Sequence, residues 1–248
     1  MKIYRRSITD RLNDNDGALR AAVNCDSAVI KNLFDGTQSG MTSHVNLQEY
    51  FGNIDIYLFD QLLKNRFHPS MQILDAGCGG GRNLIYFLRN GYGVFGVDES
   101  SEAIAQVRHV ASMLAPRLPE NNFRVEAVEK MSFAGELFDA VISSAVLHFA
   151  RDEEHWGDMV REMWRVLKPS GIFFARLAST IGMERYLTHI EGRRFYLPSG
   201  SDLFLVDDEM INAVTRQLGG EFIEPVKTVV VGKERSMTTW CLLKPGDS

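Results

Sequence analysis

The chain has 248 residues, of which 45% are hydrophobic and 24% are charged, and its formal net charge is -5. This length and composition are typical of one globular domain with a full core, which excludes a largely disordered chain and a membrane protein. The negative charge gives no general attraction to phosphate backbones or anionic lipid, so neither nucleic acid nor a membrane is expected as a partner.

The three cysteines lie far apart and match no zinc or thioredoxin spacing. Reduced, unpaired thiols and a site without metal are therefore expected at Cys25, Cys78 and Cys241. The first six residues are followed by polar residues and not by the apolar segment of a signal peptide. The cytoplasm is the expected compartment.

Two helical patterns come before the first core strand, at residues 17–34 and at about residues 47–65. In the second, apolar residues three or four positions apart line one helical face: Phe51, Ile54, Leu58 and Leu62. We expect residues 1–66 to form an N-terminal helical cover of the same domain whose core is residues 67–248.

From about residue 71 the sequence alternates between apolar strands and amphipathic helices, which is typical of a parallel sheet with helices on both faces. The expected strands are Ile73–Leu74, Gly93–Val97, Phe123–Val128, Phe138–Ser143 and Ile172–Ala178. The expected helices are Asn83–Asn90, one that begins near Ser100, and His155–Leu167.

The last part of the chain departs from this alternation. An irregular stretch at about residues 180–206 predicts a lid-like insert. A helix follows, capped near Asp207 and running to Leu218, and segments 222–231 and 237–243 then predict a hairpin. The expected fold is α/β and doubly wound, with a mostly parallel seven-stranded sheet that ends in a C-terminal antiparallel hairpin.

A glycine-rich turn follows the first core strand, with the sequence Asp75-Ala76-Gly77-Cys78-Gly79-Gly80-Gly81. At the carboxyl ends of parallel strands, glycines let a ligand approach the backbone closely. The dinucleotide fingerprint needs a third glycine where this chain has Arg82, so the turn does not fit a nicotinamide cofactor. Asp75 either supports the turn through backbone N–H groups or touches the ligand directly.

A second acidic residue, Asp98, ends the next strand, where it can accept hydrogen bonds from both hydroxyls of a ribose. The alternative is that Asp98 only caps the next helix, although Ser100 can perform that role. A helix that starts near Gly81 would direct N–H groups at the turn, where they suit a small carboxylate such as that of methionine. An adenosine joined to such a carboxylate fits both ends of the site.

These residues resemble the motifs of a known family. The run Ile73–Gly81 resembles the first motif of class I methyltransferases, and Gly96-Val97-Asp98 resembles their ribose-binding acid. Phe138–Ser144 is similar to their fourth-strand motif, and Val166–Gly171 is similar to their turn into the fifth strand. The resemblance covers roughly residues 72–243.

The resemblance implies S-adenosylmethionine as the methyl donor and S-adenosylhomocysteine as the product. The family often has an Asp where this chain has Ala127. Adenine binding is therefore expected to use the backbone of Val128 and Glu129, with the Glu129 side chain as a partner of the exocyclic amine. The candidate cofactor-binding residues are Asp75, Gly77, Cys78, Gly79, Gly81, Asp98, Glu99, Val128, Glu129, Ser143 and Ser144.

The expected reaction is direct in-line methyl transfer to a small-molecule acceptor. The continuation Gly81-Arg82-Asn83 is similar to that of tellurite-resistance-type and other small-molecule members. His148, after the fourth strand, is a candidate base that takes a proton from the acceptor; the alternative is that it only shapes the pocket, because alignment alone can drive methyl transfer. A cofactor-binding module without catalysis is the alternative function, ahead of a nicotinamide oxidoreductase.

Overall fold

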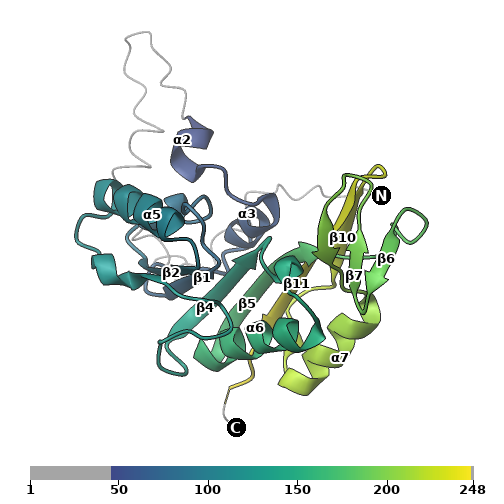
Figure 1. The fold of residues 1–248 in the computed structure, drawn as a ribbon. Helices are drawn as coiled ribbons and strands as arrows, with labels where there is room; N and C mark the ends of the chain where they lie inside the picture. Colours follow the sequence, from purple (N-terminus) through teal and green to yellow (C-terminus); the bar gives the residue numbers. More distant parts are fainter. Residues whose placement is uncertain (1–45, 247–248) are drawn as a thin grey trace, which may run out of the picture. The chain divides into compact units, whose positions relative to one another are not determined.

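A mixed sheet of eight strands forms the centre of residues 46–246, the part of the chain that the computed structural model describes (Figure 1). The strands lie in the order β10-β11-β5-β4-β1-β2-β3, and β9 pairs with β11. Their bounds are β1 Gln72–Ala76, β2 Gly93–Asp98, β3 Phe123–Val125, β4 Phe138–Ser144, β5 Leu167–Ala178, β9 Glu221–Phe222, β10 Lys227–Val231 and β11 Arg235–Leu243. The predicted helix at residues 17–34 and Cys25 lie outside the described residues.

The pairing of the strands confirms the predicted doubly wound sheet and its terminal hairpin. β1 to β5 are parallel neighbours, and β11 runs antiparallel between β5 and β10. The hairpin begins at Lys227 and not at Phe222, because residues 221–222 form the separate short strand β9 against Leu242 and Leu243. Seven strands follow the main path of the sheet, and β9 is an addition to them.

Helices cover both faces of the sheet (Figure 1). One buried cluster joins α6 and α7 to the strands through residues such as Trp156, Ile211 and Trp240. The other cluster joins α3, α4 and α5 through residues such as Phe87 and Val107. The helix bounds are α3 Ile56–Leu63, α4 Ile85–Arg89, α5 Ser101–Leu114, α6 Glu153–Val166 and α7 Asp208–Leu218. Among these described residues, no helix is both long enough and apolar enough to span a membrane.

Side-chain caps fix where the long helices begin. The Ser100 hydroxyl accepts a hydrogen bond from Ala103 N at 3.2 Å, which confirms the predicted start of α5. Asp207 caps α7 as predicted, through a 2.8 Å bond from Met210 N. Helix α6 begins two residues earlier than predicted, because Asp152 accepts from His155 N at 2.8 Å and so acts as its cap.

The predicted single helix at residues 47–65 is wrong, because the structure divides it into α2 (Leu47–Phe51) and α3. Gly52 ends α2 with φ of 65°, a left-handed backbone that does not continue a helix. Asp55 then starts α3 by accepting a hydrogen bond from Tyr57 N at 2.9 Å. Asp55 therefore lies in the connection between the two helices, as the cap of α3, and not within a continuous helix.

The sequence predicts an irregular stretch at residues 180–206, and this prediction is wrong. The stretch forms a small antiparallel sheet. Its strands are β6 Thr188–Glu191, β7 Arg194–Tyr196 and β8 Asp202–Phe204. Arg193 pairs with Asp207 at 2.8 Å, and Arg194 donates to Ala150 O at 3.2 Å, so ionic and polar contacts fasten this insert to the core. Strands of three or four residues are too short to show a clear alternation in the sequence.

Candidate functional site

The glycine-rich turn between β1 and α4 is held against the end of β2. Gly77 N and Cys78 N both donate to Val97 O at 2.9 Å. Gly77 has φ of 82°, and a Cβ there would lie 2.4 Å from Val146 Cγ2, so only glycine fits. At Gly79, with φ of 51°, no atom lies within 4 Å of the position that a Cβ would take. The turn is thus tightly packed at Gly77 and open at Gly79.

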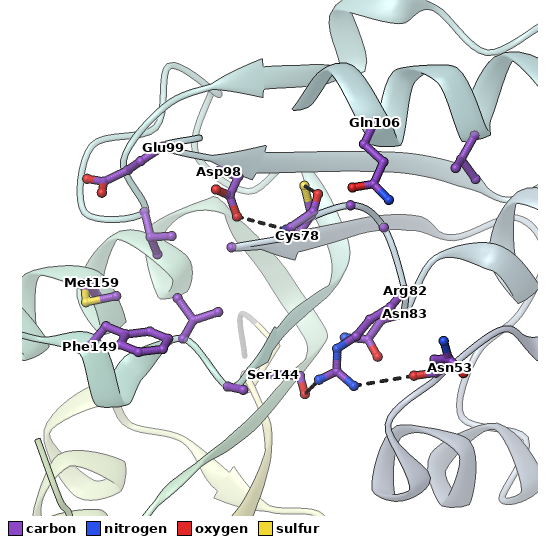
Figure 2. Close-up of a pocket in the computed structure, with 18 of the residues that line it drawn as sticks. Asn53, Cys78, Arg82, Asn83, Asp98, Glu99, Gln106, Ser144, Phe149 and Met159 are labelled. Atoms are coloured by element: carbon purple, nitrogen blue, oxygen red, sulfur yellow. Dashed lines mark hydrogen bonds between the residues drawn. The ribbon is translucent and has the colours of Figure 1, made fainter. Parts of the chain in front are cut away.

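The predicted helix start near Gly81 is wrong. Helix α4 begins at Ile85 and has five residues, because residues 82–84 form turns. Because α4 is short and begins four residues after Gly81, its N-terminus does not supply the positive partial charge that was expected beside a carboxylate. The positive charge beside the turn comes instead from Arg82, whose Nη2 donates to Ser144 Oγ at 3.1 Å (Figure 2).

Asp98 connects the end of β2 to the glycine-rich turn. Its Oδ2 accepts from Gly79 N at 2.9 Å, and its Oδ1 accepts from Ser100 N at 2.9 Å. The Ser100 hydroxyl, and not Asp98, caps helix α5. Because each carboxylate oxygen can accept about two hydrogen bonds, Asp98 retains acceptor capacity for a diol at the pocket surface.

These residues surround a cavity of about 910 Å³ at the carboxyl ends of the parallel strands (Figure 2). Its size is that of a small-molecule site. Within residues 46–246, no group of three or more His, Cys, Asp or Glu side chains is placed to hold a metal ion. The predicted cofactor-binding residues that line the cavity are Gly77, Cys78, Gly79, Gly81, Asp98, Glu99, Val128, Glu129 and Ser144.

Two of the predicted binding residues, Asp75 and Ser143, do not line the cavity. Both are 1% exposed. Neither carboxylate oxygen of Asp75 has a hydrogen-bond partner among the described residues. Burial raises the pKa of Asp75 to about 8, against the opposing charge of Arg82. Asp75 therefore lies beneath the turn and not at the ligand surface.

His148, the predicted base, is also absent from the cavity wall. It lies in the short helix η3 (Leu147–Phe149), is 7% exposed, and packs edge-on against Phe149 with ring centroids 4.6 Å apart. Burial lowers its pKa to about 4, because a charged imidazole is disfavoured away from water. His148 therefore lies outside the cavity wall, and its role as a base stays a prediction from the sequence.

Several residues that line the cavity were not predicted from the sequence. Gly52 and Asn53 come from the connection between α2 and α3, and Gln106 comes from α5. A further group comes from η3, the connection after it and α6: Phe149, Arg151, His155 and Met159. The cap signal at Asp152 could have indicated this group, because it marks the start of α6 soon after the end of β4.

A polar network fastens α3 to the sheet beside the cavity. The carboxylate of Asp55 is 3% exposed and accepts from Arg176 Nη1 at 2.7 Å and from Ser144 Oγ at 3.2 Å. The Arg176 guanidinium also lies over the Tyr57 ring, 4.8 Å from its centroid. Since Ser144 also accepts from Arg82, the network extends to the cavity wall.

Comparison with known proteins supports a family for this site. Residues 74–175 match the family model described as a methyltransferase domain. This segment is similar to class I methyltransferase domains. This span includes the glycine-rich turn, Asp98 and the strand that ends at Ser144, so the matched segment of the methyltransferase domain contains most of the cavity wall.

Relatives of the methyltransferase domain include the mitochondrial ubiquinone biosynthesis O-methyltransferase of Mus musculus, 32% identical over 48% of this chain and 33% of that protein. The ubiquinone biosynthesis O-methyltransferase of Methylobacterium sp. (strain 4-46) is 28% identical over 64% of this chain and 63% of that protein. The chain thus spans less than two thirds of the length of either relative.

A solved structure shows the same fold. The S-adenosylmethionine-dependent methyltransferase of Methanosarcina mazei has a TM-score of 0.59 and 22% identity, covering 75% of this chain and 98% of that one. Together with the family match, this confirms the predicted class I methyltransferase fold.

Proposed function

We propose that the chain transfers the methyl group of S-adenosylmethionine to a small-molecule acceptor. The observation that carries the proposal is the position of Asp98, which is bonded to the glycine-rich turn and faces the same cavity. A ribose diol can bond to the remaining acceptor sites of this carboxylate. The open backbone at Gly79 leaves room for a ligand to pass beside the turn.

The order of the strands sets the direction of the donor across the sheet. β2 lies between β1 and β3, so a ribose at Asp98 has the glycine-rich turn on one side and Val128 and Glu129 on the other. The adenine then lies toward Glu129, and the methionine part lies toward Arg82. The guanidinium of Arg82 has two neutral oxygen partners, Ser144 Oγ and Asn53 O, and can pair with the donor carboxylate.

S-adenosylmethionine, if bound, would supply a methyl carbon on a sulfonium sulfur for transfer to an acceptor lone pair, and the sulfur would leave as the neutral thioether of S-adenosylhomocysteine. The protein contributes alignment. Asp98 and the turn fix the nucleoside, Arg82 fixes the other end, and Ser144 with Val146 borders the space between them. Holding two reactants in line lowers the barrier without a dedicated base, which agrees with the buried position of His148.

The small-molecule acceptor is supported by the size of the cavity and by the names of the relatives, which act in ubiquinone biosynthesis. The negative net charge of the chain argues against nucleic acid as the acceptor. The cytoplasm stays a prediction from the sequence.

Calorimetric titration of the purified chain with S-adenosylmethionine, S-adenosylhomocysteine and NAD tests the cofactor. We expect the first two to bind and Asp98→Ala to weaken both by about 10- to 150-fold, because about 1.5–3 kcal/mol of charge-assisted hydrogen bonding is lost. Glu102→Ala is the matched control, since Glu102 is exposed in the first turn of α5 and does not line the cavity. NAD binding without a signal from the methyl donor would contradict the proposal.

Turnover separates an enzyme from a binding module. The chain is incubated with S-adenosylmethionine carrying a labelled methyl group and with a library of small hydroxyl, amine and thiol acceptors. We expect label to appear on at least one acceptor. Cofactor binding with no transfer to any of them would favour the module without catalysis.

A further inference from the structure

The tautomer of one histidine in the cavity wall is fixed by the backbone. His155 lies in the first turn of α6, and its Nδ1 accepts a hydrogen bond from Arg151 N at 3.1 Å. A backbone N–H can only donate, so Nδ1 carries no proton. The proton of the neutral ring is therefore on Nε2.

That nitrogen faces a carboxylate in the same cavity wall. His155 Nε2 lies 3.0 Å from Glu129 Oε1, and the two side chains are 11% and 23% exposed. The pair is at ion-pair distance without the alignment of a hydrogen bond. Oε1 of Glu129 thus lies next to His155, and because Glu129 also lines the cavity, its second oxygen is left for a ligand.

Glu129 lies beside the place expected for the base of the donor. Strand β3 is the neighbour of β2, with Val125 opposite Asp98, and the chain leaves β3 four residues before Glu129. Val128 and Met159, 6% and 5% exposed, give this end of the cavity apolar walls that suit the flat faces of a purine. Glu129 and His155 supply polar groups at the same end of the cavity.

We infer that His155 is a positioning residue that holds Glu129 as the acceptor for the 6-amino group of adenine, so that the site selects 6-aminopurine over 6-oxopurine nucleosides. The inference rests on the proposed function. It also accounts for Ala127, which stands where the resemblance stated above leads us to expect an Asp. The acidic group comes from two residues further along the chain, and α6 supplies the imidazole that orients it.

The selectivity follows from the chemistry of a carboxylate, which accepts hydrogen bonds and cannot donate them. A 6-amino group donates to Glu129, whereas a 6-oxo group presents a second acceptor and leaves the carboxylate unpaired. Sites built to bond one polar group reject an analogue that lacks it strongly. His155 adds to this because its Nε2 lies 3.0 Å from Glu129 Oε1 and so restricts the orientation of the carboxylate.

The test compares two product analogues by calorimetry, S-adenosylhomocysteine and S-inosylhomocysteine, which differ at the 6 position of the purine. For the unaltered chain we expect the adenosyl compound to bind at least about 30-fold more tightly. Glu129→Gln should bring this ratio close to one, because its amide can donate to the 6-oxo group. The readout is a ratio of binding constants and needs no acceptor.

Two substitutions isolate the role of His155. His155→Leu removes the donor and should lower the ratio by about 5- to 10-fold, with a smaller change in binding of the adenosyl compound alone. His155→Gln, whose amide N–H can lie near the position that Nε2 has in the unaltered chain, should restore most of the ratio of binding constants. His109→Leu is the matched control, since His109 is exposed on α5, outside this cavity, and should leave the ratio unchanged.

The outcomes separate the two proposals. If the unaltered chain binds S-adenosylhomocysteine but the ratio survives Glu129→Gln, or survives His155→Leu in a folded variant, the inference is wrong and the proposed function stands. If His155→Gln and His155→Leu lower the ratio equally, the imidazole acts through packing and the inference is also wrong. If the unaltered chain binds neither compound, the proposed function fails first.

Discussion

The ion pair between Asp55 and Arg176 gives a stability prediction that can be worked from the structure. Asp55 is 3% exposed, and Arg176 is its only cationic partner within the described residues. Arg176→Met leaves a buried carboxylate bonded to two neutral donors, Tyr57 N and Ser144 Oγ. Losing one partner of a buried pair typically costs 3–5 kcal/mol. Because the Arg176 side chain is 20% exposed, we expect about 2–3 kcal/mol.

Urea unfolding at pH 7, followed by circular dichroism, measures this free energy. The double variant Asp55→Asn/Arg176→Met should recover at least about 1 kcal/mol relative to Arg176→Met, because the amide carries no charge and still caps α3. Arg161→Met is the control, since its pair with Asp158 is exposed on α6 and should contribute less than about 0.5 kcal/mol.

If the double variant is no more stable than Arg176→Met, the unpaired Asp55 carboxylate is not the cause of the lost stability. The cost would then come from lost packing against Tyr57 and not from an unpaired charge. A loss below about 0.5 kcal/mol for Arg176→Met would contradict the prediction as well, because a buried carboxylate without its cation cannot be that inexpensive.

Three further predictions concern the glycine-rich turn and the neighbouring Arg82. Gly79→Ala should lower the free energy of unfolding, measured by thermal unfolding, by about 1–2 kcal/mol because of the left-handed backbone at this position. Gly77→Ala should lower it by about 1–3 kcal/mol more, because its Cβ would also clash with Val146. Equal losses for the two variants would contradict that clash. The raised pKa of Asp75, about 8, means that its contribution to stability is present below about pH 4 and is lost as the pH rises through 8. Asp75→Asn should therefore flatten the decline in stability between pH 5 and 8 in urea unfolding, and parallel declines would count against it. Arg82→Met should weaken S-adenosylhomocysteine by about 5- to 30-fold in calorimetry and leave 5′-methylthioadenosine, which lacks the carboxylate, unchanged; equal losses for both would show that Arg82 does not pair with the carboxylate.

Features that depend on neighbouring residues were predictable from the sequence. The cap at Ser100 and the acid at the end of β2 follow from side chains and backbone a few residues apart. The parallel order of the strands follows from the alternation of apolar segments, which repeats over more than a hundred residues. The same local signals placed nine of the predicted binding residues on the cavity wall.

Features that depend on distant partners were not predictable. The break at Gly52 and the cap at Asp55 are local, but the burial of the Asp55 carboxylate depends on Arg176, 121 positions away. His155 was expected only as the first residue of a helix, and its contact with Glu129 depends on how two separate segments of the chain pack together. The predicted helix at Gly81 failed because three residues of turn precede α4.

The position of β11 has a consequence for how the chain reaches its fold. Residues 235–243 lie between β5 and β10 in the interior of the sheet, and Trp240 and Leu242 are fully buried there. During synthesis, β1 to β5 leave the ribosome well before this strand, so one edge of β5 has unpaired backbone N–H and C=O groups until β11 is available. We expect this edge to be open to incorrect pairing until residue 243 has emerged.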